Sequence, residues 1–291
     1  MRLSTRFADG SFVVTGEVGP AKGASADDVL DGAARMASAV DAVNVTDSQS
    51  AVMRLGSLAV SSLLKDAGIE PVFQLTCRDR NRIALQSDLL SAAALGIENV
   101  LCITGDHMVL GDHPEAKKVF DLDSVQLLAA ANGLNEGHDL AGHEIEDLPD
   151  LCLGAVVNPG SDDLEMQLLK MQKKIDAGAA FFQTQAVFDA DTFARFMEKA
   201  QTLGTPVMAG IVPLKSAGMA RYMNDHIAGV RVPDRIIDRM AATPKEDRKK
   251  VSIEIAAELA RALKGLCQGI HLMPLGWDDV VPPIVDAAGL R

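Results

Sequence analysis

The sequence predicts an α/β protein built as a single (β/α)8 (TIM) barrel over residues 1–291, with a helical insertion before the last strand. Short runs rich in β-branched residues alternate with longer segments of helical periodicity. Several of the short runs are apolar almost throughout, as parallel strands are when both faces of their sheet are covered. The alternation continues over roughly 250 residues without a composition break that would mark a linker, which is typical of the barrel.

The expected strands are spread along the whole chain, and each is followed by at least one helix candidate. They are expected at residues 12–17, 42–47, 71–77, 99–106, 151–159, 181–188, 207–213 and 269–276. A helical insertion is expected at about residues 233–265. A doubly wound open sheet is the alternative, but the segment "GEVGPAKG" after the first strand lacks the G-x-G-x-x-G pattern of that fold.

The segment 161–178 illustrates the helices expected between the strands. Ser161 can cap the first turn, and Gly178 can end the last one. Acidic residues follow the cap and lysines occupy the final turns, which suits the helix dipole. The apolar residues that share one face at helical spacing are Leu164, Leu168, Met171 and Ile175.

Composition excludes several classes of function. The formal net charge of -12 argues against a nucleic-acid partner, which needs a basic surface. No run reaches the roughly 18 apolar residues that cross a bilayer, and the first residues do not resemble a signal peptide. The four cysteines form no CxxC pair, and the histidines match no metal-ligand spacing. We therefore expect a cytoplasmic protein with reduced thiols, no metal site and no membrane partner.

Polar residues recur at the carboxyl ends of the expected strands. In a barrel these ends meet at one mouth, where catalytic residues collect. Any strand end meets water, so one such residue means little, but several together favour a ligand pocket. The residues at these ends are Glu17, Thr46, Asp47, Gln74, Thr76, Cys77, Thr104, Gly105, Asp106, Asn158, Gln183 and Gln185.

Four of these residues suggest particular chemistry. Glu17 has apolar neighbours in the sequence, which would keep its carboxyl group protonated and ready to donate; an exposed strand-end acid is the alternative. Asp106 follows Gly105, where the backbone can approach a ligand closely; an Asx turn or a helix cap is the alternative. Gln183 and Gln185 point to the same face of their strand, and amides can read the donor–acceptor edge of a heterocycle.

An ordered series of motifs resembles the methylenetetrahydrofolate reductases, which are flavin-dependent (β/α)8 barrels. The motifs are "VTGEVGP", "QLTC", "ITGD", "KMQKKIDAGA", "FFQTQAVFD", "AGIVPLKS" and "GVRVP", and together they cover nearly the whole chain. The resemblance implies reduction of methylenetetrahydrofolate to methyltetrahydrofolate by hydride transfer from reduced flavin. It also implies that Glu17 is the general acid and that Asp106 and Gln185 complete the catalytic set.

The resemblance further implies which residues hold each ligand. The implied FAD-binding positions are Thr46, Gln74, Thr76, Thr104, Gly105, Asp106, Phe120, Asn158 and Lys174. The implied folate-binding positions are Glu17, Asp106, Gln183 and Gln185. The electron donor would be NADH, NADPH or a partner protein, and a homo-oligomer is expected.

The sequence also departs from the enterobacterial type of this family. The residues that replace its flavin- or nicotinamide-contacting side chains are Gln74, Thr104, Asn158, Gln167 and Ala217. The pattern is more similar to short reductases of acetogens and related bacteria, some of which work with a metal-containing partner subunit. Two other functions stay open: a pterin-binding methyltransferase-type barrel that passes a methyl group to a corrinoid, and a non-catalytic subunit of a folate-reducing complex.

Overall fold

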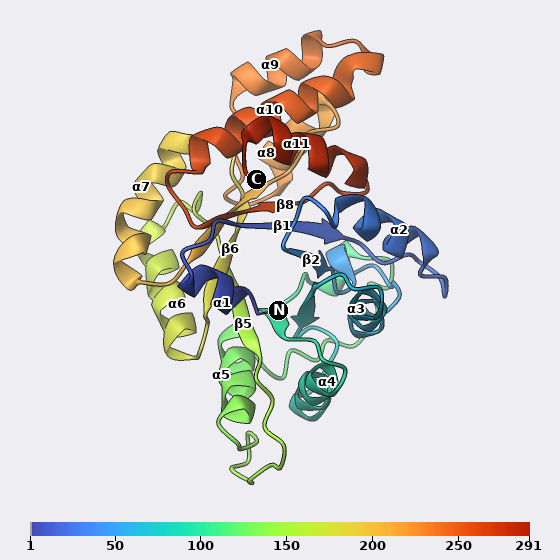
Figure 1. Cartoon of the computed structure of the whole chain (residues 1–291), viewed down its shortest axis with the longest axis vertical. Coiled ribbons are helices and arrows are strands. Elements are labelled where there is room, and N and C mark those ends of the chain that lie inside the picture. Colours follow the sequence, from blue (N-terminus) through green and yellow to red (C-terminus); the bar gives the residue numbers. More distant parts are fainter. Residues whose placement is uncertain (1) are drawn as a thin grey trace.

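The computed structural model describes residues 2–291 and confirms the barrel, with eight parallel strands closed in sequence order (Figure 1). The closing pair is β8 against β1, in a register that places Thr15 opposite His271. The strands are β1 (Val13–Val18), β2 (Ala42–Val45), β3 (Pro71–Thr76), β4 (Asn99–Ile103), β5 (Cys152–Val157), β6 (Phe181–Ala186), β7 (Val207–Ile211) and β8 (Gly269–Leu272).

Helices surround the barrel and bury the outer faces of its strands in one large apolar core (Figure 1). The helices that follow the strands are α2 (Asp27–Met36), α3 (Ser57–Asp66), α4 (Arg82–Ala94), α5 (Ser124–Asn135), α6 (Leu164–Asp176), α7 (Ala190–Ala200), α8 (Ala217–His226) and α11 (Val281–Ala288). A short helix, α1 (Leu3–Ala8), precedes β1, and its Leu3 packs in a second apolar cluster with Val13 and Phe181. This cluster fills the end of the barrel at which the strands begin.

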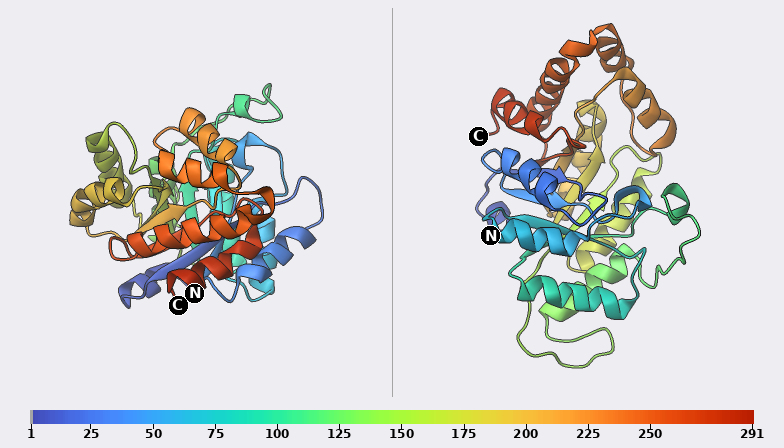
Figure 2. Two further views of the ribbon diagram at one scale, coloured as in Figure 1. Left: turned by 90° about the horizontal axis from the view of Figure 1, so that it is seen from above. Right: turned by 90° about the vertical axis from the view of Figure 1, so that its right-hand side faces the viewer.

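The expected helical insertion is confirmed. After α8 the chain forms α9 (Asp234–Ala242) and α10 (Arg248–Leu263) before it enters β8. Figure 2 shows these helices extending at one end of the molecule. The insertion therefore lengthens the outer layer and does not interrupt the strand order.

Helix α6 has the expected apolar face but a different cap. Its N-cap is Asp163, whose Oδ1 accepts a hydrogen bond from the Met166 N–H at 2.9 Å, so the expectation of a Ser161 cap is wrong. Ser161 lies two residues further out, where its hydroxyl accepts from the Asp163 N–H. Met171 is buried on the predicted face, and Gly178 ends the segment with φ +103°.

Strand β4 ends earlier than expected, at Ile103, so Thr104, Gly105 and Asp106 belong to the following loop. The reason is the backbone of Gly105, whose φ of +91° is open to glycine and would strain other residues. The turn carries the Asp106 side chain over the mouth of the barrel.

Candidate active site

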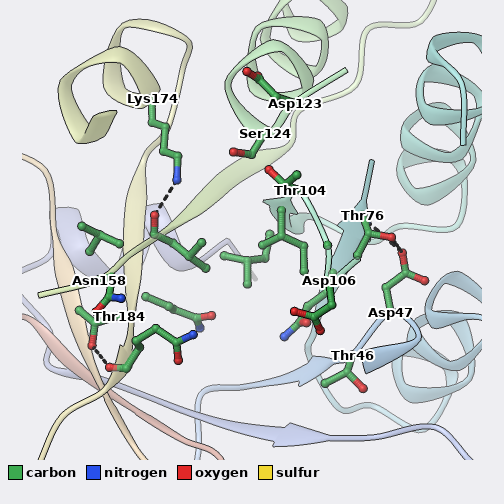
Figure 3. Close-up of a pocket in the computed structure, with 18 of the residues that line it drawn as sticks. Thr46, Asp47, Thr76, Thr104, Asp106, Asp123, Ser124, Asn158, Lys174 and Thr184 are labelled. Carbon is green, nitrogen blue, oxygen red and sulfur yellow. Dashed lines mark hydrogen bonds between the residues drawn. The ribbon is translucent and has the colours of Figure 1, made fainter. Parts of the chain in front are cut away.

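A cavity of about 730 Å³ lies at the carboxyl ends of the strands (Figure 3). Its walls come from the strand ends and from helices α5 and α6. The predicted site residues that line it are Glu17, Thr46, Gln74, Thr76, Thr104, Gly105, Asp106, Asn158, Lys174, Gln183 and Gln185. Phe120 is not among the lining residues: it lies in the loop before α5, with its ring centroid 6.5 Å from that of His107.

Glu17 is buried on β1, with 9% of its surface exposed. Its Oε2 accepts a hydrogen bond from Gln74 Nε2 at 2.9 Å and lies 3.5 Å from His271 Nε2. The sequence neighbours suggested an apolar setting for this carboxyl group. The closed barrel instead places an amide and an imidazole beside it, because β3 and β8 also direct side chains into the interior.

A chain of buried polar side chains continues below Glu17. Gln183 and Asn44 exchange two amide hydrogen bonds across the barrel, at 2.8 and 3.1 Å. Gln183 Nε2 also donates to Thr15 Oγ1 at 3.3 Å, and this hydroxyl lies 2.8 Å from His271 Nδ1. The Gln183 amide is thus hydrogen-bonded to other side chains of the barrel interior, whereas Gln185 is exposed at the mouth.

The hydroxyl of Thr46 lacks a partner. Its Oγ1 is buried and makes no hydrogen bond within residues 2–291, although Thr46 lines the cavity. A buried hydroxyl without a partner costs free energy, which a polar ligand atom would recover. The hydroxyl of Thr76, in contrast, donates a hydrogen bond to Asp47 Oδ2 at 2.8 Å (Figure 3).

Asn158 lines the cavity, but its side chain is hydrogen-bonded to the loop after α8. Its Nδ2 donates to the Ala228 carbonyl at 2.9 Å, and its Oδ1 accepts from the Gly160 N–H at 3.2 Å. A side chain on Gly229 would collide with this amide. Asn158 therefore ties the end of β5 to the loop that follows α8.

The wall formed by α6 is cationic. Lys170, Lys173 and Lys174 all line the cavity. Burial, together with the charge of Lys170, lowers the pKa of Lys174 to about 8, and its Nζ donates to the Val156 carbonyl at 2.7 Å (Figure 3). Negatively charged groups of a ligand would be favoured beside these lysines.

A further cation, Arg78, reaches the cavity from the end of β3. Only 2% of its surface is exposed, and its Nε and Nη2 bind the Asp79 carboxylate. Its Cβ lies close to the Gly105 backbone, since a Cβ built on that glycine would be 3.1 Å away. Arg78 therefore adds another cationic side chain to the lining of the cavity, on the side of the Gly105 loop.

Two neighbouring loops form a lip over one side of the cavity, which we define as residues 48–53 and 106–112. Asp106 Oδ2 accepts a hydrogen bond from the Ser50 N–H at 2.9 Å, and Asp112 Oδ1 accepts from the Met53 N–H at 3.1 Å. Ser50 and Ala51 adopt left-handed φ angles of 57° and 56°, which are costly outside glycine. Such strain is held in place only where surrounding contacts enforce it.

A second cavity, of about 460 Å³, lies on another side of Glu17. It shares Glu17 and Gln49 with the first cavity, and Arg35 and Arg54 also line it. Glu17 therefore stands between two hollows of the barrel mouth.

Sequence reasoning missed Arg78, Lys170, Lys173 and His271. Two signals were present: an arginine directly after the third strand, and a histidine inside the otherwise apolar run "GIHL". Asn44 and Thr15 carried no comparable signal, because single polar residues within strands are common.

No helix within residues 2–291 is both long enough and apolar enough to cross a membrane. The same residues contain no group of three or more His, Cys, Asp or Glu side chains placed to hold a metal ion.

Comparison with known proteins finds one family along nearly the whole chain. The family model for methylenetetrahydrofolate reductase matches residues 2–289. A probable methylenetetrahydrofolate reductase (NADPH) of Caenorhabditis elegans is 23% identical over 240 residues, covering 80% of this chain and 34% of that protein. The 5,10-methylenetetrahydrofolate reductase of Salmonella typhimurium is 26% identical over 240 residues, covering 80% of this chain and 74% of that protein. The chain thus spans about a third of the nematode relative.

A solved structure has a similar fold along its full length. It is an uncharacterized protein from Clostridium thermocellum that binds two copies of 5-methyl-5,6,7,8-tetrahydrofolic acid. The TM-score is 0.66 at 15% sequence identity, and the match covers 99% of each chain.

Proposed function

Since this chain belongs to the methylenetetrahydrofolate reductase family, we propose that it catalyses the flavin-dependent reduction of methylenetetrahydrofolate to methyltetrahydrofolate. In this reaction the methylene carbon of the folate receives a hydride, the bond from that carbon to N10 breaks, and N10 receives a proton. The proton is the part of the reaction that a side chain of this protein must supply.

The observation that carries the proposal is the setting of Glu17. It is a buried acid that lines the cavity and is held by Gln74 at 2.9 Å. A positioned acid of this kind can protonate a leaving nitrogen. Asp106 and Gln185 lie on the rim of the same cavity and are proposed to bind the pterin through its polar edge.

The cavity suits FAD as the cofactor. The unpartnered hydroxyl of Thr46 can bond a polar ring atom, and the Gly105 backbone allows close approach. Lys174 and Arg78 offer cations for the diphosphate. When bound, FAD would supply the hydride that the folate receives, and the protein would supply position and electrostatics.

The folate is proposed to lie between the cofactor and Glu17. The second cavity beside Glu17 gives additional space for the rest of the molecule, and Arg35 and Arg54 could face its carboxylates. The structural neighbour that binds methyltetrahydrofolate supports a folate ligand for this fold.

The source of electrons is proposed to be a partner protein, with NADH or NADPH as the alternatives. Ala217 occupies the position where other members of the family stack an aromatic ring on nicotinamide. It is buried at the first position of α8 and does not line the cavity. The site therefore lacks an aromatic platform at that position.

A methyltransferase-type barrel is the second candidate, because the neighbouring structure binds methyltetrahydrofolate. The two candidates differ in their need for flavin. A methyltransferase of this type would bind the folate, pass its methyl group to a corrinoid and leave FAD unbound.

The deciding experiment follows the flavin spectrum under anaerobic conditions. The chain is loaded with FAD, reduced chemically and mixed with methylenetetrahydrofolate. We expect reoxidation of the flavin and formation of one methyltetrahydrofolate for each flavin reoxidised. Absence of FAD binding, or bound reduced flavin that folate does not reoxidise, would contradict the reductase proposal.

A further inference from the structure

We propose that a directional chain of hydrogen bonds, from Asn44 through Gln183 and Thr15, sets the tautomer of His271 and thereby decides which oxygen of Glu17 carries the proton. In this arrangement His271 is protonated on Nε2 and neutral, and the Glu17 proton resides on Oε1. The catalytic meaning rests on the proposed function, but the hydrogen-bond order itself follows from the contacts.

The first step is the amide pair in the barrel interior. Asn44 Nδ2 donates to Gln183 Oε1 at 2.8 Å, and Gln183 Nε2 donates back to Asn44 Oδ1 at 3.1 Å. Both side chains are buried, with 0% and 2% of their surfaces exposed. The pairing leaves Gln183 Nε2 with one further hydrogen, and this hydrogen faces Thr15 Oγ1 at 3.3 Å.

The second step is the hydroxyl group of Thr15. It accepts from Gln183, and it has a single hydrogen of its own to donate. Thr15 is fully buried, and among residues 2–291 the other polar contact of its Oγ1 is His271 Nδ1 at 2.8 Å. A hydroxyl hydrogen left without an acceptor in such a place would be costly. The hydroxyl therefore donates to Nδ1.

The third step is the imidazole ring. Nδ1 must be an acceptor, and Gln183 Nε2 also faces it at 3.5 Å. With Nδ1 unprotonated, the proton of the neutral ring resides on Nε2. Nε2 points to Glu17 Oε2 across 3.5 Å, a separation that is longer than a normal hydrogen bond. The N–H is thus placed to close on this oxygen when Glu17 becomes charged.

The last step is the carboxyl group. Gln74 Nε2 donates to Oε2 at 2.9 Å, and the His271 N–H faces the same atom. Two donors directed at Oε2 exclude a proton there. Oε1 has no hydrogen bond within residues 2–291 and is not enclosed, since it is absent from the buried atoms that lack a partner. Oε1 is therefore the oxygen that carries the acid proton.

This order gives His271 a positioning role. As a neutral donor it favours the carboxylate form that remains after Glu17 has given its proton away. With the opposite tautomer, Nε2 would present a lone pair to Glu17 Oε2. The carboxylate that remains after proton transfer would then have no hydrogen-bond donor from His271. The amide pair thus acts on the acid through two side chains, Thr15 and His271.

The tautomer can be measured directly by long-range 1H–15N correlation spectra of the full chain labelled with [15N]histidine, without cofactor or folate. The signals of His271 are assigned from their loss in His271→Gln. We expect a pyrrole-type Nε2 and a pyridine-type Nδ1 in the unmodified chain at neutral pH. A protonated Nδ1, alone or together with Nε2, would overturn the proposal whether or not the chain is a reductase.

Two substitutions test the direction of the chain. Thr15→Val removes the hydroxyl at nearly constant volume, and Thr15→Ser keeps it. Gln183→Glu replaces the donor with an acceptor, so the Thr15 hydroxyl should turn toward the new carboxylate and His271 should shift to Nδ1–H. We expect the tautomer to be kept in Thr15→Ser and inverted in Gln183→Glu. In Thr15→Val we expect a mixture of both tautomers, because only the contact of Gln183 Nε2 with Nδ1 at 3.5 Å remains. An unchanged tautomer in both Thr15→Val and Gln183→Glu would overturn the proposal.

The catalytic consequence is read from flavin reoxidation by methylenetetrahydrofolate. We expect Thr15→Val to slow this half-reaction by about tenfold, the worth of one hydrogen bond to a charged group, and Thr15→Ser to restore most of the rate. FAD affinity should stay unchanged in both. If the spectra show the expected tautomers but no folate chemistry occurs in the unmodified chain, the proposed function has failed and the hydrogen-bond order stands.

Discussion

At Glu17 one carboxylate oxygen is occupied by protein donors and the other is open. Gln74 holds Oε2 at 2.9 Å, and His271 lies 3.5 Å from the same atom. A carboxyl group held in this way is oriented without being neutralised, since no lysine or arginine contacts it within residues 2–291. That combination fits an acid that must release its proton and take another one up in each cycle.

Replacement of this acid by its amide tests its role. Glu17→Gln keeps the shape and can keep a hydrogen bond, but it cannot donate a proton. We expect the folate half-reaction to fall by about a hundred- to ten-thousand-fold. FAD binding and reduction of the flavin by its donor should change little, because neither needs protonation of the folate.

The matched control for this variant is Glu165→Gln, which alters an exposed carboxylate on α6. Stopped-flow absorbance of the flavin measures both half-reactions for each variant. A loss of less than about tenfold in the folate half-reaction, or a defect confined to FAD binding, would reduce Glu17 to a structural role.

Lys174 gives a pH dependence with a definite sign. Burial, and after it the charge of Lys170, lower the pKa of Lys174 from its ordinary value of 10.5 to about 8. Between these two values the unfolded chain binds a proton that the folded chain does not, so the free energy of unfolding rises with pH across this window. Below about 8 the cost of the buried charge is present in full.

Urea unfolding measured at about pH 7 and about pH 9.5 tests this sign against Lys174→Met. The unmodified chain should gain stability relative to the variant at the higher pH. Lys199→Met, which alters an exposed lysine on α7, should show no such relative change. An equal response of the unmodified chain and Lys174→Met would show that burial does not affect this amine.

At the scale of the elements, helix α6 supplies the cationic wall of the cavity. Helix α6 presents Lys170, Lys173 and Lys174, and its position depends on the turn that starts it. Asp163, and not Ser161, caps that turn. The cap is therefore part of what places the cationic wall.

Removing the cap should destabilise the helix and, with it, the fold. Asp163→Ala is expected to lower the free energy of unfolding by about 1 kcal/mol, the usual worth of an N-cap. Ser161→Ala, two residues away, should cost less, because its hydroxyl accepts only long bonds of 3.4 Å, from the Asp163 N–H and the Gln167 side chain, and none from a backbone N–H of the helix. Chemical denaturation of both variants gives the comparison, and equal losses would contradict the assignment of the cap.

A methyl group added at Gly111 should separate the two loops of the lip. A Cβ on Gly111 would lie 1.8 Å from the Ala51 carbonyl oxygen, so Gly111→Ala must separate the two loops. Because Asp106 is held by Ser50 in the same lip, we expect weaker FAD binding with little change in global stability. Gly23→Ala is the control, since nothing lies within 4 Å of its added methyl group. Unchanged FAD affinity in Gly111→Ala would show that the lip does not shape the site.

At the scale of the whole molecule, the closed barrel brings the polar groups of the cavity to one mouth. Ala217 offers no ring for nicotinamide, and the motif pattern is similar to short reductases, some of which work with a partner subunit. We expect the isolated chain, loaded with FAD, to be reduced by NADH or NADPH only slowly, while a low-potential donor reduces it readily. Anaerobic absorbance spectra distinguish these cases, and rapid reduction by NADH would contradict the expectation.

The barrel and the residues of its mouth could be predicted from the sequence because the signals are local. Apolar runs, helical periodicity and polar residues at strand ends are properties of neighbouring residues, and the closed parallel topology brings all strand ends to one side. Glu17, Asp106 and Gln185 accordingly meet at the cavity as the motifs indicated.

What the tertiary structure alone decided is which side chain meets which. The contacts of Glu17 with His271, of Gln183 with Asn44 and of Arg78 with the loop at Gly105 join residues far apart in the chain. The position of Phe120 outside the cavity lining was likewise decided by tertiary packing. These pairings follow from barrel closure and strand register, which no local pattern encodes, because a shift of one residue in register turns every side chain of a strand to the opposite face.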